Sequence, residues 1–147
     1  MFNLPKDGYL YELVRGELCR MAPPSAKHGS TTARLFSRAG IYIEDNDLGE
    51  AFTSETGFLL AQDPDTVLAP DFAFIAKERL PEPLPDTYIP VVPDLVLETR
   101  SHSDTRRRVN EKVALWPEFG AKIVWELDPR KRVLTVYRSG VEPRTWP

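Results

Sequence analysis

The chain contains very little cysteine or histidine and no long apolar run. Among its 147 residues are one cysteine, Cys19, and two histidines, His28 and His102. A single cysteine excludes a disulfide within the chain and a thiolate metal cluster, and two histidines argue against a His-rich zinc site. No segment approaches the roughly 20 apolar residues that span a bilayer, and the N-terminus has no signal-peptide pattern. We therefore expect a cytoplasmic protein with no membrane partner.

An overall excess of positive charge is also missing. The 19 Lys and Arg against 22 Asp and Glu give a net charge of −3, which argues against a protein that coats nucleic acid non-specifically. The charges are unevenly distributed, however, because five cations lie close together in sequence. They are Arg100, Arg106, Arg107, Arg108 and Lys112. A local basic surface is therefore expected on an acidic chain.

Hydrophobic periodicity and turn residues predict alternating strands and helices. In the first half these are two short strands in "YLYELVRGELCRM", a helix over about 30–42, and two long strands, "EAFTSETGFLL" and "VLAPDFAFIA". In the second half they are the strand "PDLVLETRS", a helix over about 105–116, and the strand pair "KIVWEL" and "RVLTVY". Ser103 or Asp104 should cap the second helix, and Pro117 should end it, because its ring would clash with a carbonyl one turn earlier.

These elements predict an α/β fold of the mixed-sheet α+β type. A central mixed sheet should carry helices on its two sides, with one β-hairpin near the N-terminus and another near the C-terminus. The 41% hydrophobic and 28% charged residues are usual for a globular protein. We expect residues 1–147 to form one domain, since this length is enough for one layered core.

Two of the predicted strands carry acids at their ends, Asp71 in "LAPDFAFIA" and Glu98 in "PDLVLETR". Asp94 shares a strand face with Glu98, but the two lie about 13 Å apart along the strand, too far to bind one ion. Asp94 is instead expected to accept backbone hydrogen bonds. If the two strands pair with Asp71 opposite Glu98, the carboxylates could share Mg²⁺, completed by waters and substrate phosphate. The alternative is a buried structural acid pair stabilised by Arg100 or Lys112.

Several cations could serve such a site. Arg100 follows Glu98 by two residues, and its pKa above about 12 limits it to an electrostatic role. Lys112 could bend back over the strand end as a cation or, if its pKa were lowered, as a base. The triplet Arg106, Arg107 and Arg108 opposes the helix dipole, and a phosphate contact offers a reason for it. His28, beside the first predicted helix, is a candidate substrate contact.

Four segments of the chain resemble one family. They are "YELVRGELCRMAPPS", "LAPDFAFI", "PDLVLETRSHSDTRRRVNEKVALW" and "VWELDPRKRVLTVYR". In this order they are similar to the Uma2 family, a bacterial group of restriction-endonuclease-like proteins within the PD-(D/E)xK nuclease superfamily. The resemblance covers nearly the whole chain. It implies a restriction-endonuclease-like core and cleavage of phosphodiester bonds in DNA with Mg²⁺ or Mn²⁺. Related nucleases often act as dimers, which makes a homodimer a hypothesis.

The resemblance also assigns roles to individual residues. Pro70-Asp71 corresponds to the PD, Glu98 to the (D/E), and Lys112 to a lysine that this family places on the helix. Glu17, in "RGEL", matches a recurrent acid near the N-terminus and becomes a candidate catalytic residue. The family pattern implies that Asp71, Glu98 and the Thr99 carbonyl hold the metal ion.

The remaining implied roles concern the reaction itself. Lys112 would position or activate water, Arg100 would stabilise phosphate charge, and in-line attack would expel the 3′ oxygen. The chain departs from the family pattern at "ETRSHS" and at Trp116-Pro117, and we expect it to lack a C-terminal segment that relatives usually carry. The alternative function is therefore a catalytically inactive nuclease-fold module that binds nucleic acid or a protein partner.

Overall fold

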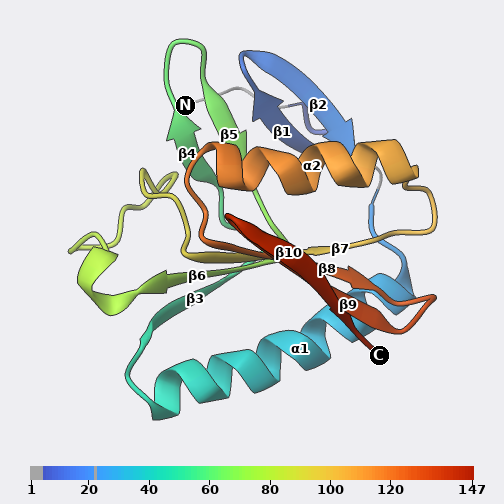
Figure 1. The fold of residues 1–147 in the computed structure, drawn as a ribbon. Coiled ribbons are helices and arrows are strands. Elements are labelled where there is room, and N and C mark those ends of the chain that lie inside the picture. The colour runs from blue at the N-terminus through green and yellow to red at the C-terminus, as the bar shows by residue number, and fades with distance from the viewer. Residues whose placement is uncertain (1–4, 22) are drawn as a thin grey trace.

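The computed structural model describes residues 5–21 and 23–147, which fold into two sheets and two α-helices (Figure 1). The main sheet of this described part has the strand order β10-β9-β8-β7-β6-β3, and β7 and β8 are its parallel pair. Its strands are β3 (Gly49–Thr53), β6 (Phe72–Ala76), β7 (Leu95–Thr99), β8 (Ile123–Asp128), β9 (Val133–Arg138) and β10 (Val141–Trp146).

The smaller sheet has the order β2-β1-β5-β4 and is antiparallel. Its strands are β1 (Leu10–Val14), β2 (Glu17–Met21), β4 (Phe58–Ala61) and β5 (Thr66–Leu68). The two α-helices are α1 (Ala26–Asp45) and α2 (Arg106–Glu118), and a short 3₁₀ turn, η1 (Lys77–Arg79), follows β6. In the described residues no helix is long and apolar enough to cross a membrane.

The helices cover opposite faces of the main sheet. α1 lies on one face, while α2 lies on the other, together with the smaller sheet (Figure 1). The core cluster under α1 includes Leu35, Phe36, Ala39, Ile43, Phe72 and Leu97. The cluster under α2 includes Phe58, Leu68, Val96, Val113, Trp116 and Val124. The predicted mixed sheet with a helix on each side is therefore confirmed.

The predicted helix ends need correction. α1 begins at Ala26, about four residues earlier than predicted, because the Ser25 side chain caps it by accepting from the His28 amide (3.3 Å). At α2 the cap is Thr105, not Ser103 or Asp104. α2 also continues through Pro117 to Glu118. A proline in the last turn is tolerated here, because little helix remains beyond the hydrogen bond that it removes.

The two long predicted strands are each divided in two. The first becomes β3 and β4, and the second becomes β5 and β6, because the chain leaves one sheet for the other at each break. Pro70 lies at the second break and has no amide hydrogen for a ladder bond. The strand β10 was not predicted. It is an exposed edge strand with a register shift between Val141 and Arg144, around Pro143, and such a strand lacks a regular apolar alternation.

Gly49, at the start of β3, is expected to tolerate no side chain. Its φ is 148°, and an added Cβ would overlap the carbonyl oxygen of Ile75 on the paired strand. Gly49→Ala should therefore lower the free energy of unfolding by about 2 kcal/mol or more. Gly29, inside α1, has nothing near its Cβ position, so Gly29→Ala should raise stability by about 0.5–1 kcal/mol.

Urea denaturation of the two variants and the parent protein measures both changes. Equal stability of the Gly49→Ala variant and the parent would contradict the close backbone approach at β3.

Candidate active site at the end of the central strand

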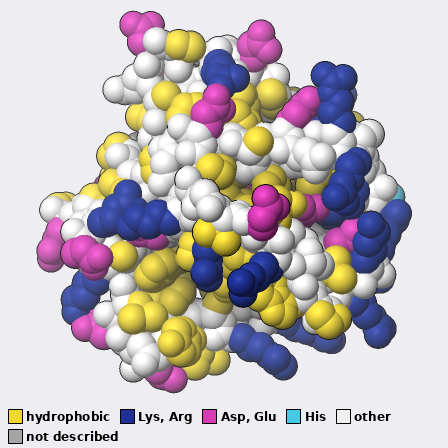
Figure 2. All heavy atoms as spheres, viewed as in Figure 1, with side chains coloured by type: hydrophobic (Ala, Val, Ile, Leu, Met, Phe, Trp, Pro, Cys, Tyr) yellow, Lys and Arg dark blue, Asp and Glu magenta, His cyan; other side chains and the backbone are white. Residues whose placement is uncertain are grey.

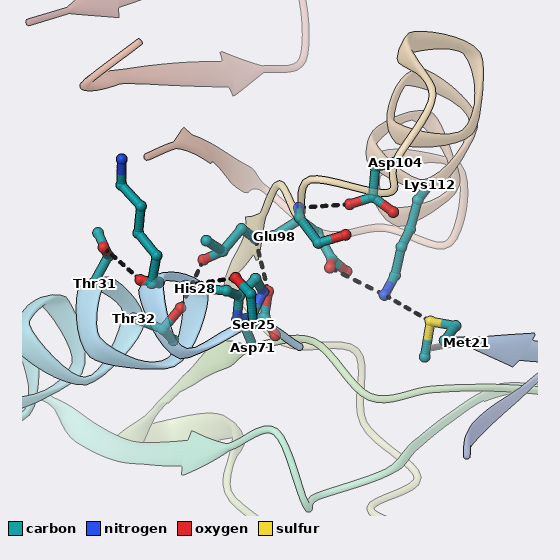
Figure 3. A network of polar contacts seen from close by, with 12 residues as sticks. Met21, Ser25, His28, Thr31, Thr32, Asp71, Glu98, Asp104 and Lys112 are labelled. Carbon is teal, nitrogen blue, oxygen red and sulfur yellow. Dashed lines mark hydrogen bonds and ion pairs between the residues drawn. The ribbon is translucent and has the colours of Figure 1, made fainter. Parts of the chain in front are cut away.

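The candidate site begins with the register of β6 and β7. These antiparallel strands pair Phe72 with Leu97, so Asp71 and Glu98 stand opposite each other one position further on. The Asp71 amide donates to the Leu97 carbonyl (3.0 Å), one residue out of register with the ladder, which ends at Phe72 and Leu97. Asp71 and Glu98 are therefore neighbours at the ends of two paired strands, and a shared ion stays a prediction. Figure 3 shows the two acids within one network of polar contacts.

Asp71 is held by the backbone of β7 and by α1. Its Oδ2 accepts from the Thr99 amide (2.7 Å) and lies 3.2 Å from His28 Nε2. Thr32 and Thr99 join α1 to the strand end by a hydroxyl contact of 2.9 Å. Both of these contacts of Asp71 fall on Oδ2.

His28 is buried and lines the cavity, and its predicted contact with nucleic acid stays a prediction. The sequence suggested a nucleic-acid contact beside the helix, but α1 starts earlier, and the ring lies in its first turn against Asp71. Burial acts to lower the pKa of His28, and the hydrogen bond and charge of Asp71 outweigh it and raise the pKa. Nδ1 is buried without a hydrogen-bond partner in the described residues. The imidazole therefore contacts Asp71 from the first turn of α1.

Glu98 is 7% exposed and uses both carboxylate oxygens. Oε1 accepts from Trp116 Nε1 (2.8 Å), and Oε2 lies 3.0 Å from Lys112 Nζ. Burial raises the pKa of Glu98 to about 8, because Lys112 opposes the effect only in part and the nearby Asp71 and Glu12 add to it. The carboxylate is therefore easily protonated, and an added cation would favour its charged form.

Lys112 bridges two carboxylates. Its Nζ lies 3.0 Å from Glu98 Oε2 and 3.1 Å from Oε1 of Glu12, on β1. Glu12 is 6% exposed, and the same oxygen accepts from the Ala69 amide (2.9 Å). Burial alone would lower the pKa of Lys112, but the charges of Glu12, Glu98 and Asp71 raise it above its ordinary value. The raised pKa favours a protonated Lys112 and does not favour the basic role.

These groups line one cavity of about 610 Å³. Its polar wall includes Glu12, His28, Asp71, Glu98, Thr99, Arg100, Arg108 and Lys112. Its apolar wall includes Tyr9, Leu10, Leu13, Leu18 and Met21 from the β1–β2 hairpin. A cavity of this size is in the range of small-ligand sites.

The donor set of the cavity consists of hard oxygen atoms. Three carboxylates, from Glu12, Asp71 and Glu98, lie around Lys112, and the cavity is also lined by Glu55, Asp104, Arg100 and Arg108. In residues 5–21 and 23–147, however, no cluster of three or more acid, His or Cys side chains is arranged to hold a metal ion. Lys112 lies between Glu12 and Glu98, so Asp71 and Glu98 remain the candidate ligands, and both oxygens of Glu98 already contact protein groups.

Glu17 lies outside this arrangement. It is the exposed first residue of β2 and does not line the cavity. Glu12, on the preceding strand, is the acid of this hairpin that reaches Lys112, and the sequence reasoning missed it. A signal was present, because Glu12 shares its strand face with Val14, which packs on the core. An acid on a core-facing strand position indicates a buried partner.

The predicted arginines separate into different environments. Arg100 lines the cavity, but its guanidinium pairs with Asp128 of β8 (3.2 Å). Arg107 is turned outward and pairs with Glu111 (2.8 Å). Arg108 lines the cavity and donates to the carbonyl of Arg20 in β2 (2.9 Å). The three consecutive arginines Arg106–Arg108 are all exposed at the start of α2.

Asp94 is placed as the sequence suggested, at the opposite end of β7. Its carboxylate accepts from the Ala76 amide (2.9 Å) and pairs with Arg79 and Lys122 at 2.7 Å each. These contacts connect β6, η1 and the start of β8, so Asp94 has a structural role distant from the cavity.

A mixed sheet between α1 and α2 places the chain in the restriction-endonuclease-like fold class. The chain belongs to the Uma2 family, whose model, described as "Putative restriction endonuclease", matches residues 1–146. Comparison with curated proteins finds no match. A solved structure from Anabaena variabilis ATCC 29413, described as "a putative nuclease belonging to DUF820", has a TM-score of 0.83 and 18% sequence identity, covering 97% of this chain and 79% of that chain. At this identity the likeness establishes the fold.

Glu98→Gln is expected to change the pH dependence of stability. The pKa of Glu98 is raised to about 8 from an ordinary 4.5, so the folded parent protein loses stability as the pH rises through this range. The glutamine variant has no proton to lose there. In EDTA, its Tm should therefore rise relative to the parent as the pH is raised from about 5 to about 8.5.

Thermal unfolding at several pH values tests this expectation. Glu17→Gln, which removes an exposed acid from the neighbouring hairpin, is the control and should follow the parent at each pH. A Tm difference for Glu98→Gln that is independent of pH would contradict the raised pKa.

Proposed function

We propose that the protein is a divalent-metal-dependent endonuclease that hydrolyses phosphodiester bonds in DNA. The observation that carries the proposal is the convergence of Asp71, Glu98 and Lys112, from β6, β7 and α2, in one cavity. Membership of the Uma2 family supports it, because the family is described as "Putative restriction endonuclease". The solved structure described as "a putative nuclease" supports the same class of activity.

Asp71 and Glu98 would hold Mg²⁺ or Mn²⁺, with the Thr99 carbonyl as a further oxygen ligand. Hard oxygen donors from one or two carboxylates, completed by waters and a substrate phosphate, are the arrangement that Mg²⁺ favours. When bound, the ion would offset charge on the phosphate and lower the pKa of a coordinated water.

The side chains around the acids fix their positions. The Thr99 amide and His28 orient Asp71 through Oδ2, and the Trp116 indole orients Glu98 through Oε1. Lys112 stays protonated, so it would stabilise negative charge that develops on the phosphate and hold an attacking water as a donor. Such prior orientation reduces the reorganisation that the reaction requires.

The charges around the cavity suit an anionic polymer. Figure 2 shows Lys and Arg side chains gathered on the side of the molecule where α2 begins. Arg106, Arg107 and Arg108 are exposed there, and Arg100 lines the cavity. We propose that this surface contacts DNA phosphates. The homodimer, expected because two strands need two sites, and the cytoplasmic location stay predictions.

A catalytically inactive module that binds nucleic acid or a protein is the second candidate function. One observation favours it: Lys112 lies between Glu12 and Glu98 and contacts a carboxylate oxygen of each. A site closed in this way could retain the fold without binding a metal ion. The two candidates differ in whether Asp71 and Glu98 bind a divalent cation.

Cleavage of supercoiled plasmid in Mg²⁺ or Mn²⁺, and its absence in EDTA, is the expected result. Asp71→Asn, Glu98→Gln and Lys112→Met should each lower the cleavage rate by about 10²-fold or more, because the first two weaken metal binding and the third removes a cation that would offset charge on the phosphate. Glu17→Gln should retain the parent rate, since Glu17 does not line the cavity. Circular dichroism of each variant verifies the fold.

Two outcomes would contradict the proposal. Cleavage that survives Asp71→Asn in a folded variant would place the activity elsewhere or in a contaminant. An inactive parent protein, combined with Mn²⁺ titration that shows no binding dependent on Asp71 and Glu98, would favour the inactive module.

A further inference from the structure

The turn between β8 and β9 carries a second set of cations beside the site. Because β7 and β8 are parallel, with Thr99 paired to Leu127, their C-terminal ends lie side by side, and the segments that follow them leave the sheet at the same end of the strands. The segment after β7 leads to the arginines that begin α2. The segment after β8 carries Arg130, Lys131 and Arg132, all exposed. Figure 1 places both segments on the same side of the molecule.

The backbone of this turn is fixed by Asp128. Its Oδ1 accepts from the amides of Arg130 (3.0 Å) and Lys131 (3.1 Å), and its Oδ2 pairs with Arg100 at the end of β7 (3.2 Å). Burial acts to raise the pKa of Asp128, but these amides and Arg100 outweigh it and lower the pKa, so the carboxylate stays ionised. Arg100 therefore connects the site strand to the turn.

The side chains of the turn are available to an anion. Within residues 5–21 and 23–147, none of the ion pairs involves Arg130, Lys131 or Arg132. Arg107, by contrast, already pairs with Glu111. The cations of this turn need not break an ion pair in order to contact phosphate oxygens, and the turn that carries them has a fixed backbone.

We propose that the turn from Asp128 to Arg132 binds the phosphate backbone of DNA that extends from the cavity. The inference rests on the proposed function, since it assigns part of the substrate's path. The β8–β9 turn and the N-terminal end of α2 together would contact several phosphates beside the C-terminal ends of β7 and β8. Figure 2 shows several Lys and Arg side chains along this margin of a chain whose net charge is −3. Arg100 acts here as a positioning residue for the turn.

The test compares two charge-matched double variants in an Asp71→Asn background, which prevents cleavage. Arg130→Gln with Lys131→Gln removes two cations from the turn. Lys77→Gln with Arg138→Gln also removes one lysine and one arginine, but at the other end of the central strands. Arg138 pairs there with Ile123 at the start of β8, and Lys77 follows the end of β6, which is antiparallel to β7. Fluorescence anisotropy with a labelled DNA duplex, the corresponding single strand and an RNA of equal length, over a salt series in EDTA, gives the affinities.

The turn variant should bind DNA about tenfold more weakly at about 0.1 M salt, and its slope of log K against log salt should fall by about 2. The opposite-end variant should keep the slope of the Asp71→Asn parent. Equal slopes for the two double variants, or a parent that does not bind DNA, would overturn the inference. Turn-dependent binding that is tighter for RNA than for either DNA would overturn the assignment to DNA.

Cleavage by the turn variant with Asp71 intact separates this inference from the proposed function. The variant should show a raised KM and an unchanged kcat, because the turn contacts substrate away from the reacting phosphate. DNA that is bound through the turn but never cleaved by the parent would contradict the endonuclease and leave the inference standing. Cleavage of DNA by the parent, with binding that does not depend on the turn, would support the endonuclease and contradict the inference about the turn.

Discussion

The bridge made by Lys112 is the interaction on which the candidate site depends. Its ammonium joins Glu98 of the central strand to Glu12 of the N-terminal hairpin, so that α2, β7 and β1 meet at one point. Buried ion pairs give little net stability, because desolvation of the charges offsets their attraction. The bridge therefore defines where the three elements meet, beside Asp71, more than it stabilises the fold.

The site concentrates negative charge that burial disfavours. Glu98 is surrounded by apolar core and by two other acids, and its raised pKa follows from that position. His28 and the Thr99 amide supply fixed donors to Asp71. A divalent cation would relieve the same repulsion that these contacts oppose. Burial and the closeness of other acids disfavour the charged carboxylates, and the same two features would favour binding of a metal ion.

Strand alternation was enough to separate Asp94 from Glu98, but it left the pairing of Asp71 with Glu98 as a hypothesis, because a local pattern does not show which strands are neighbours. The contacts of Glu12 and His28 were not predicted. The contact of Glu12 with Lys112 joins distant parts of the chain, and the position of His28 depends on a helix start set by Ser25. The divided strands were missed for a similar reason, since local periodicity does not reveal a change of sheet.

The most direct test of a metal site at this strand end is a crystal soaked with Mn²⁺ and measured at an energy where manganese scatters anomalously. We predict an anomalous peak about 2.1 Å from carboxylate oxygens of both Asp71 and Glu98. The Asp71→Asn variant should lack the peak. A parent crystal at saturating Mn²⁺ with no peak beside these carboxylates, and with Lys112 still between Glu12 and Glu98, would contradict the account.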